Sequence, residues 1–447
     1  MAKAHDLTVG STKKLLLYFA FPTLISNLFQ QFYNLADTAI AGHILGDNAL
    51  VAIGASSSIY SLVLTFAFGL NGGFGIIIAQ CFGARDEKRL KNAVAQSIIL
   101  NALISVVVCV ASIFVAKPVL RLMNTPDARL EDAYGYIIII LTMIIVPMLY
   151  NLESTVLRSL GDSKTPLYFL ILASILNIVL DYVFIKYLGM GVKGAAAATI
   201  VAQLVAVLLC LAVIMKGFKI IRLSRESFTP NRPLLGKMLS TGFSMAMMNS
   251  IFSIGSIIMQ GAINSLGEGV IAAHLASRKA AEMFMQPLVT LGTACSTFVG
   301  QNYGAAKYKR INESLKYSII YAFVWSVISF FVLFFAGGEI AGLITGTENR
   351  QVIENTQMYL KINAPFYFVL GILFILRFSI QSIDRKIPPL ISSGMELATK
   401  ICAAFVFIPK WEYFGACIAE PISWCLGAVF LIFAFKKALK GIPQKTQ

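Results

Sequence analysis

The chain has 447 residues, of which 57% are hydrophobic and 13% are charged, and its mean hydropathy is +0.76. Soluble domains carry roughly 25% charged residues, so this composition excludes an ordinary water-soluble fold. The net charge of +15 would suit a nucleic-acid partner only if the basic residues formed one surface. They lie instead in the polar breaks between apolar runs, which indicates a lipid bilayer and no nucleic acid.

Apolar runs of roughly 20 residues, long enough to cross a hydrocarbon layer of about 30 Å, recur along the whole chain. We count about twelve and predict that each is a helix, because stretches such as 136–148 do not alternate as barrel strands do. Their approximate centres are Phe29, Phe66, Val106, Met143, Ile175, Val201, Ser253, Met285, Ser329, Gly371, Phe405 and Phe430. The predicted fold class is an all-α integral membrane protein.

The sequence repeats itself when it is shifted so that Gln80 meets Gln301. The segment Gln80–Ala84 then corresponds to Gln301–Ala305, and the same shift pairs several shorter segments over nearly a whole half. Six spans in each half make the repeats parallel. We therefore predict an N-terminal lobe of helices 1–6 at residues 1–215, a linker at 216–237, and a C-terminal lobe of helices 7–12 at residues 238–447.

The distribution of Lys and Arg predicts the orientation in the membrane. Alternate loops, including the stretch Lys216 to Lys237, hold most of the basic residues, which by the positive-inside rule places both termini and the linker in the cytoplasm. The expected location is the cytoplasmic (inner) membrane. The first apolar run begins near Leu15 and has no small-residue cleavage site, so we interpret it as a span and not as a signal peptide.

Polar side chains follow one face of the first predicted span. Asn27, Gln30, Asn34 and Asp37 are spaced by three, four and three residues, as on one side of a helix. An amide in such a stripe can simply hold helices together, but an ionisable group at membrane depth is costly and suggests function. Pro22, earlier in this span, either kinks the helix or marks its start.

The fifth span carries a second acid at membrane depth. Asn177 and Asp181 are four residues apart, and no Lys or Arg lies between Thr165 and Ile185. If Asp181 approaches Asp37, two carboxylates and an amide could hold a hard monovalent cation or share a proton. The alternative is that Asp181 lies hydrated at a helix end.

Charged side chains also occur in the second half, in a different arrangement. They are Arg278 and Glu282 in the eighth span, Arg377 in the tenth, and Glu396 and Lys400 in the eleventh. The shift that defines the repeat places Ile258 and Cys402 opposite Asp37 and Asp181, so the acid pair is not duplicated. The pairs spaced by four residues either neutralise each other or contact substrate.

Several motifs are absent or favour a structural role. The sequence lacks GxxxxGK[ST], and its three histidines are far apart, so we expect neither an ATP cassette nor a histidine metal site. The seven cysteines show no CxxC spacing and are interpreted as free packing thiols. Gly69 and Gly73 predict a close contact between helices.

Taken together, the sequence resembles the multidrug and toxic compound extrusion (MATE) family over essentially its full length. The resemblance rests on Pro22 and Asp37, the repeated motifs at 80–83 and 301–304, the segment Leu160–Pro166, Asn177 with Asp181, and Gly194–Thr199. It implies a V-shaped, two-lobed exporter without a cofactor. Such an exporter, expected to act as a monomer, exchanges amphipathic and often cationic compounds for Na⁺ or H⁺.

Within the family, the sequence is similar to the prokaryotic, DinF-like branch with a cation site in the N-terminal lobe. This resemblance assigns cation binding to Asp37, Asn177, Asp181 and Thr199, substrate contact to Gln30, Tyr33, Asn34, Tyr136, Arg278 and Glu282, and a hinge to Pro22. No Asp or Glu lies between Thr241 and Leu266, so a cation site in the second lobe is not expected.

Two other functions remain open from the sequence. A lipid-linked oligosaccharide or lipid flippase of the same superfamily would use Arg278 and Arg377 to hold phosphates, although about twelve spans fit it less well. A membrane-embedded transferase would need an Asp-rich or paired-histidine metal motif, and the spans contain neither. We therefore expect a transporter and not an enzyme.

Overall fold

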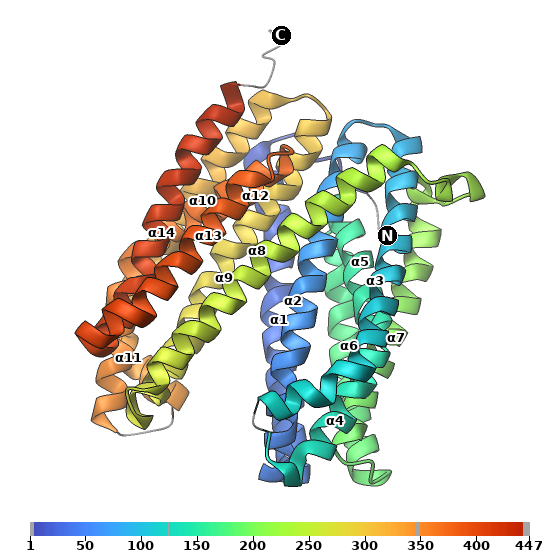
Figure 1. Ribbon diagram of the computed structural model, residues 1–447. Coiled ribbons are helices and arrows are strands. Elements are labelled where there is room, and N and C mark those ends of the chain that lie inside the picture. Colours follow the sequence, from blue (N-terminus) through green and yellow to red (C-terminus); the bar gives the residue numbers. More distant parts are fainter. Residues whose placement is uncertain (1–3, 124, 346–348, 441–447) are drawn as a thin grey trace. The chain divides into compact units, whose positions relative to one another are not determined.

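The computed structural model describes residues 4–123, 125–345 and 349–440, and every regular element in these ranges is a helix (Figure 1). The side chains of some residues inside helices lie outside the description, among them those of Asn34 and Asp37. The predicted all-α fold class is confirmed.

The first half of the chain contains seven α-helices and a π-helical segment in the described ranges. They are α1 (Thr12–Leu45), α2 (Asp47–Gly83), α3 (Glu87–Leu122), α4 (Asp127–Thr142), α5 (Ile145–Ser159), α6 (Lys164–Tyr182), η1 (Val183–Tyr187) and α7 (Val192–Gly217). Two short 3₁₀ turns, η2 (Lys219–Ile221) and η3 (Arg225–Phe228), follow before the second half begins.

The second half repeats this order with small differences in length. Its elements are α8 (Arg232–Asn264), α9 (Glu268–Gly304), α10 (Tyr308–Thr345), α11 (Arg350–Asn363), the 3₁₀ turn η4 (Ala364–Phe366), α12 (Tyr367–Ser382), α13 (Ile387–Cys402), the π-helical segment η5 (Ala403–Phe407) and α14 (Ile408–Lys440). The helices α2 and α9 both have 37 residues and begin at corresponding positions of the repeat.

Backbone conformations with positive φ also repeat between the two halves. Under the shift that pairs Gln80 with Gln301, Gly46 (φ 77°) corresponds to Gly267 (φ 96°), and Gly191 (φ 61°) corresponds to Glu412 (φ 50°). Positive φ is uncommon outside glycine, so these positions mark the same sharp turns in both halves. The internal repeat seen in the sequence is therefore a repeat of the backbone.

Nine helical stretches of the described chain are long and apolar enough to cross a membrane, and a tenth arises if α4 and α5, bent by 48°, form one span. The helix α9 is not among them and carries Arg278, Lys279 and Glu282. The chain is a multi-pass membrane protein, and the count of twelve spans stays a prediction.

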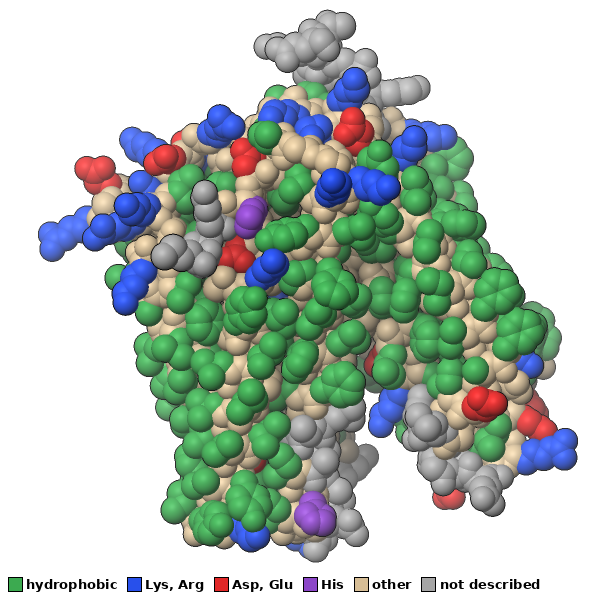
Figure 2. Space-filling model, turned by 180° about the vertical axis from the view of Figure 1, so that it is seen from behind, with side chains coloured by type: hydrophobic (Ala, Val, Ile, Leu, Met, Phe, Trp, Pro, Cys, Tyr) green, Lys and Arg blue, Asp and Glu red, His purple; other side chains and the backbone are tan. Residues whose placement is uncertain are grey.

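The outward faces of several helices carry large apolar side chains. On α3 these include Val107, which is 66% exposed, and Phe114, which is 72% exposed, and Phe335 on α10 is 72% exposed. Figure 2 shows hydrophobic side chains covering the flanks of the helices, with Lys and Arg gathered towards helix ends. This distribution fits surfaces that face lipid acyl chains.

The residues group into two compact units whose borders differ from the middle of the sequence. Unit 1 comprises Met1–Asp6 and Phe21–Ala246, and unit 2 comprises Leu7–Ala20 and Met247–Gln447. The helices α1 and α8 each continue from one unit into the other. The border in α1 falls one residue before Pro22.

Small residues bring α2 and the first part of α8 into backbone contact within unit 1. A Cβ atom added to Gly69 would lie 2.5 Å from Ala246 Cα, and one added to Gly73 would lie 2.5 Å from Gly242 Cα. The close helix contact predicted from Gly69 and Gly73 is confirmed, because only glycine permits such an approach.

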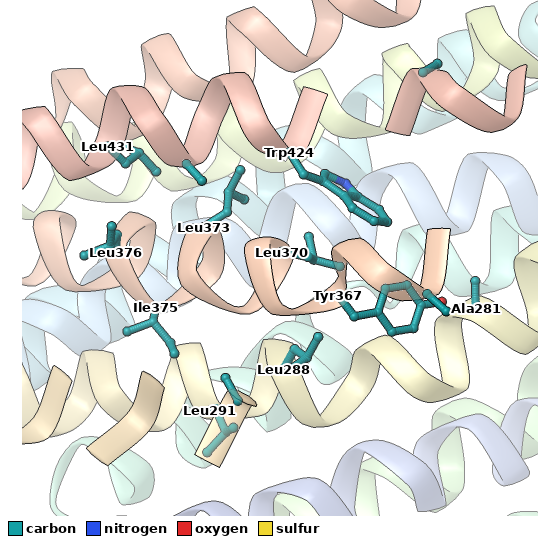
Figure 3. Packing of buried hydrophobic residues seen from close by; sticks show 14 of the residues in the cluster. Ala281, Leu288, Leu291, Tyr367, Leu370, Leu373, Ile375, Leu376, Trp424 and Leu431 are labelled. Carbon is teal, nitrogen blue, oxygen red and sulfur yellow. The ribbon is translucent and has the colours of Figure 1, made fainter. Parts of the chain in front are cut away.

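The apolar core of unit 2 forms where α9, α12 and α14 meet. Leu288 of α9, Tyr367 and Leu373 of α12, and Leu431 of α14 are completely buried, and their side chains fill the spaces between the three helices (Figure 3). Packing of this core holds in place the helices that carry charged side chains, namely Arg278 and Glu282 on α9 and Glu420 on α14.

The segment that precedes α8 packs on unit 1. Asn92 Nδ2 of α3 donates hydrogen bonds to the carbonyl oxygens of Ser227 at 2.9 Å and Thr229 at 2.8 Å. Further along, Lys237 Nζ donates to Gln80 Oε1 at 2.8 Å. The first copy of the repeated glutamine motif therefore anchors the start of the second half.

Residues Leu7 to Thr12, at the start of α1, pack in the same way within unit 2. The backbone N–H of Leu7 donates to Gln301 Oε1 at 2.9 Å, and Lys307 Nζ donates to the carbonyl oxygen of Thr8 at 2.9 Å. Thr12 Oγ1 donates to Glu313 Oε2 at 2.9 Å. The second copy of the motif therefore anchors the start of the first half.

Candidate functional site

Three polar side chains from α6 and α7 meet inside unit 1. Asn177 and Asp181 are fully buried, and Thr199 is 5% exposed. Asn177 Nδ2 lies 3.5 Å from Asp181 Oδ1 and 3.4 Å from Thr199 Oγ1. With the amide turned over, its nitrogen donates to Asp181 Oδ2 at 3.1 Å and its oxygen accepts from the Thr199 backbone N–H at 3.2 Å. The second orientation has the better hydrogen bonds.

Burial decides between the two interpretations of Asp181. The residue lies one position before the end of α6 but has no exposed surface, so the hydrated helix-end alternative is wrong. A carboxylate taken out of water needs hydrogen bonds or a cation to remain charged. This makes the cluster of Asn177, Asp181 and Thr199 a candidate site for cation or proton binding, and we call it the α6–α7 cluster.

Local sequence fixes the two helices that hold this cluster. The carboxylate of Asp162 accepts from the backbone N–H groups of Lys164 and Thr165, both at 3.0 Å, and so caps the start of α6. Gly191, with φ of 61°, turns the chain into α7. The helix α7 then carries Thr199 back to the level of Asn177.

Tyr136 belongs to an apolar group that links the end of α1 with η1 and the start of α7. Tyr136 is 5% exposed, the group includes Ile185 of η1, and Leu45 at the end of α1 packs against this group. At 1.5 Å per residue, Asp37 lies about 12 Å before Leu45 along α1, and Asp181 lies about 6 Å before Ile185. Both acids therefore precede the same apolar group by one or two helical turns.

The predicted residues of α1 lie partly beyond the description. Gln30 and Tyr33 are half-buried, whereas the side chains of Asn34 and Asp37 are outside the described part of the structure. Pro22 is buried, and its carbonyl oxygen accepts a hydrogen bond from Ser26 Oγ at 2.9 Å. The structure thus brings Asn177, Asp181 and Thr199 together, places Tyr136 in an apolar group with Ile185, and leaves the position of the Asp37 carboxylate open.

In unit 2, Arg377 and Glu396 form a buried ion pair between α12 and α13. The guanidinium donates to the two carboxylate oxygens at 2.9 and 3.3 Å, and to Ser392 Oγ at 2.9 Å. The two side chains are 5% and 6% exposed. Glu396 is therefore paired across helices, and the alternative in which it neutralises Lys400 on its own helix is wrong.

Lys400 is instead paired with Glu420 of α14. Lys400 Nζ lies 3.3 Å from Glu420 Oε1 and 4.3 Å from the centre of the Phe252 ring, and the lysine side chain is 2% exposed. Arg278 Nη1 lies 3.4 Å from the same carboxylate oxygen, while its Nη2 lies 3.2 Å from Glu282 Oε1. The predicted pair of Arg278 and Glu282 is confirmed but belongs to a larger charge cluster.

Sequence reasoning missed two buried acids. Glu420 was overlooked because no charged residue lies three or four positions away from it in a predicted span. Glu153 of α5 is 9% exposed, and its Oε2 atom has no hydrogen-bond partner among the described residues. An acid that stands alone in an apolar run is the signal that would have found both.

Comparison with known proteins places both halves of the chain in one family. The family model described as MatE matches residues 22–183 and 244–406. The two matched stretches correspond to the two halves of the internal repeat.

Similar proteins extend over most or all of the chain. The probable multidrug resistance protein YpnP of Bacillus subtilis (strain 168) is 33% identical over 309 residues, which cover 69% of each chain. The probable multidrug resistance protein YoeA of the same organism is 26% identical over 93% of this chain and 92% of its own.

A solved structure of a multidrug resistance MATE family transporter in an outward-facing conformation has a TM-score of 0.91, at 24% identity and 99% coverage of both chains. Its agreement concerns the fold. Because one family model matches both halves and a 33% identical relative covers more than two thirds of the chain, this protein belongs to the MATE family of multi-pass multidrug efflux transporters.

Proposed function

We propose that this chain is a secondary active exporter that moves amphipathic, often cationic, drugs out of the cell in exchange for Na⁺ or H⁺. It would act in the cytoplasmic membrane with both termini on the cytoplasmic side. The observation that carries the proposal is the buried α6–α7 cluster. Placing a carboxylate inside a membrane-spanning helix costs free energy, so such a residue is a candidate for a functional role.

The donor atoms of this cluster suit either coupling ion. A carboxylate, an amide oxygen and a hydroxyl are hard ligands of the kind that bind hard cations. A proton could equally be held if Asp37 approaches Asp181, since two carboxylates in a dry site do not both stay charged. Each ion would neutralise Asp181 and so favour the conformation in which Asn177, Asp181 and Thr199 are buried together.

The helix α1 is the natural element to transmit ion binding. It bears Asp37, and it continues from unit 2 into unit 1 at Phe21, one residue before Pro22. A proline cannot donate a backbone hydrogen bond, so the helix bends more easily there. A shift of a two-state equilibrium from 1:99 to 99:1 needs roughly 5.5 kcal/mol of differential ion affinity. Filling a partly dehydrated acid pair could supply this energy.

The test is gradient-driven export by Asp37→Asn and Asp181→Asn. Both substitutions keep the side-chain shape but remove the charge, so each should abolish the uptake of a fluorescent cationic dye into inside-out proteoliposomes under imposed Na⁺ or H⁺ gradients. Comparison of the two gradients identifies the coupling ion.

Asp132→Asn is the matched control, because Asp132 is exposed and pairs with Arg129 only at 3.9 Å. It should transport at the parent rate. If both Asp37→Asn and Asp181→Asn also transport at the parent rate, coupling at the α6–α7 cluster is wrong and the buried Glu153 becomes the next candidate.

A further inference from the structure

A cavity of about 290 Å³ lies inside unit 2, between α8, α9, α11 and α14. Its walls combine apolar side chains such as Met259 and Leu275 with the polar Gln260 and the charged Arg278 and Glu420. This volume is near the lower end for small-molecule sites, and the mixture of apolar walls with a few charged groups is typical of them.

The guanidinium of Arg278 makes only long contacts with its two acidic partners, and Tyr359 of the cavity wall is a further hydrogen-bond partner. The contacts of Arg278 with Glu282 and Glu420 have single N···O distances of 3.2 and 3.4 Å. Charge-assisted hydrogen bonds are normally about 2.7–2.9 Å long and often bidentate. The buried Arg377 of the same unit shows the contrast, because it makes a forked contact with Glu396 and a bond to Ser392. Arg278 therefore retains donor capacity towards the cavity.

The cations around the cavity outnumber the acids, because Arg278, Lys279 and Lys400 face only Glu282 and Glu420. The carboxylate of Glu420 is shared between Arg278 and Lys400, so one buried acid faces two buried or half-buried cations. Glu282, the other acid, lies at the rim with its side chain 53% exposed. An excess of positive charge around a partly buried cavity is unfavourable, and an entering anion would neutralise it.

We propose that this cavity binds the carboxylate of an amphipathic organic acid, with Arg278 as its forked partner and Glu282 as the group that the ligand displaces. Met259 and Leu275 would contact the apolar part of the ligand. The proposal rests on the function as an exporter and specifies one class of its substrates. A cationic compound would instead meet Arg278 and Lys279 on the cavity wall.

Binding to the purified full-length protein in detergent tests this assignment. The probe is nitrobenzoxadiazole-labelled aminohexanoic acid, its methyl ester is the uncharged comparison, and fluorescence anisotropy is the readout. We expect the acid to bind at least about tenfold more tightly than the ester, as one hydrogen-bonded charge interaction provides. Arg278→Gln should remove most of this difference and leave the ester unchanged.

The sign of the effect at Glu282 separates this proposal from a cation site. Glu282→Gln removes the competing carboxylate, so it should tighten acid binding by about threefold or more, whereas a site that uses Glu282 to hold cations predicts no gain. Arg350→Gln is the control, because Arg350 pairs with Glu354 at 2.7 Å on an exposed face outside the cavity.

Equal binding of acid and ester, or weaker acid binding by Glu282→Gln, overturns the proposal, as does tighter binding of a trimethylammonium analogue of the probe than of the acid. If Arg278→Gln does not fold, Arg278→Lys and Glu282→Gln still decide the question. The measurement needs no ion gradient, so a failure of the coupling mechanism would leave its result intact.

Discussion

The ion pair between Arg377 and Glu396 shows how strongly burial changes the importance of a single residue. Both side chains are almost completely enclosed and the guanidinium also reaches Ser392. Within such a site the desolvation cost of each charge is offset mainly by the other charge. Removal of one partner leaves a buried charge without compensation.

We therefore expect Arg377→Met to lower the free energy of unfolding by about 3–5 kcal/mol, and the double variant Arg377→Met, Glu396→Leu to recover most of that loss. Unfolding by sodium dodecyl sulfate, followed on the purified protein, measures both. Arg350→Gln serves as the exposed comparison and should change little. A double variant less stable than the single one would show that the pair contributes net stability.

At the residue scale, sequence spacing predicted contacts only within one helix. Asn177 and Asp181, four positions apart, were correctly expected to meet. Glu396 and Lys400 have the same spacing, yet both turn to partners on other helices. Which of two possible partners a charged side chain selects depends on how the helices pack, and a single sequence does not contain that information. For the same reason, the place of Thr199 came only from family resemblance.

At the scale of the elements, the contact between α2 and α8 depends on two small residues. Gly73→Ala would place a Cβ atom 2.5 Å from Gly242 Cα, so the two helices must move apart. Overpacking of this kind costs about 1–3 kcal/mol. The thermal midpoint of the detergent-solubilised protein should fall accordingly.

Gly236→Ala on α8 is the matched control, since no atom lies within 4 Å of the added Cβ and alanine favours the helix. Its midpoint should stay level or rise. An unchanged midpoint for Gly73→Ala would mean that the two helices separate without cost and that their contact is not tight in the membrane protein.

The π-helical segments are a second feature at this scale. The segment η1 follows directly after α6, where Asp181 lies, and π-helical turns are frequent at functional sites. However, η5 occupies the matching place after α13, where Cys402 stands opposite Asp181. The bulge is therefore a property of the repeated fold, and the acid is what distinguishes the first half. Hydropathy could not have predicted either segment, because α and π turns have nearly the same apolar pattern.

At the scale of the whole molecule, the proposed topology can be tested through the linker. Glu226 is exposed whereas its neighbour Ser227 is buried, so a cysteine at position 226 reports on the linker's side of the membrane. In a background without the seven native cysteines, Glu226→Cys should react with an impermeant maleimide only in inside-out vesicles.

Leu188→Cys, in the turn between η1 and α7 and 60% exposed in the native protein, provides the opposite control and should react from outside in intact spheroplasts. If Glu226→Cys reacts from the outside, the orientation deduced from the basic loops is inverted.

Composition and periodicity were sufficient for the fold class, and the match of Gln80–Ala84 with Gln301–Ala305 correctly indicated a repeated backbone. They were sufficient because lipid imposes helical spans and a duplicated sequence folds twice in the same way. The borders of the compact units were not predictable, since α1 and α8 run through them without any break in the apolar pattern. Those borders arise from tertiary contacts between residues far apart in the chain.

The contacts at the starts of α1 and α8 bear on how the two halves of the chain could have evolved. Residues Leu7–Ala20, around the start of α1, belong to unit 2, and the start of α8 belongs to unit 1. Gln301 binds Leu7, and Gln80, at the same position of the repeat, binds Lys237 of α8. In a homodimer of six-helix subunits, this arrangement would be a reciprocal exchange of N-terminal arms about a two-fold axis. Gene duplication and fusion would then have joined two subunits that their N-terminal arms already held together. The covalent linker between the halves would not have been needed for the subunits to associate.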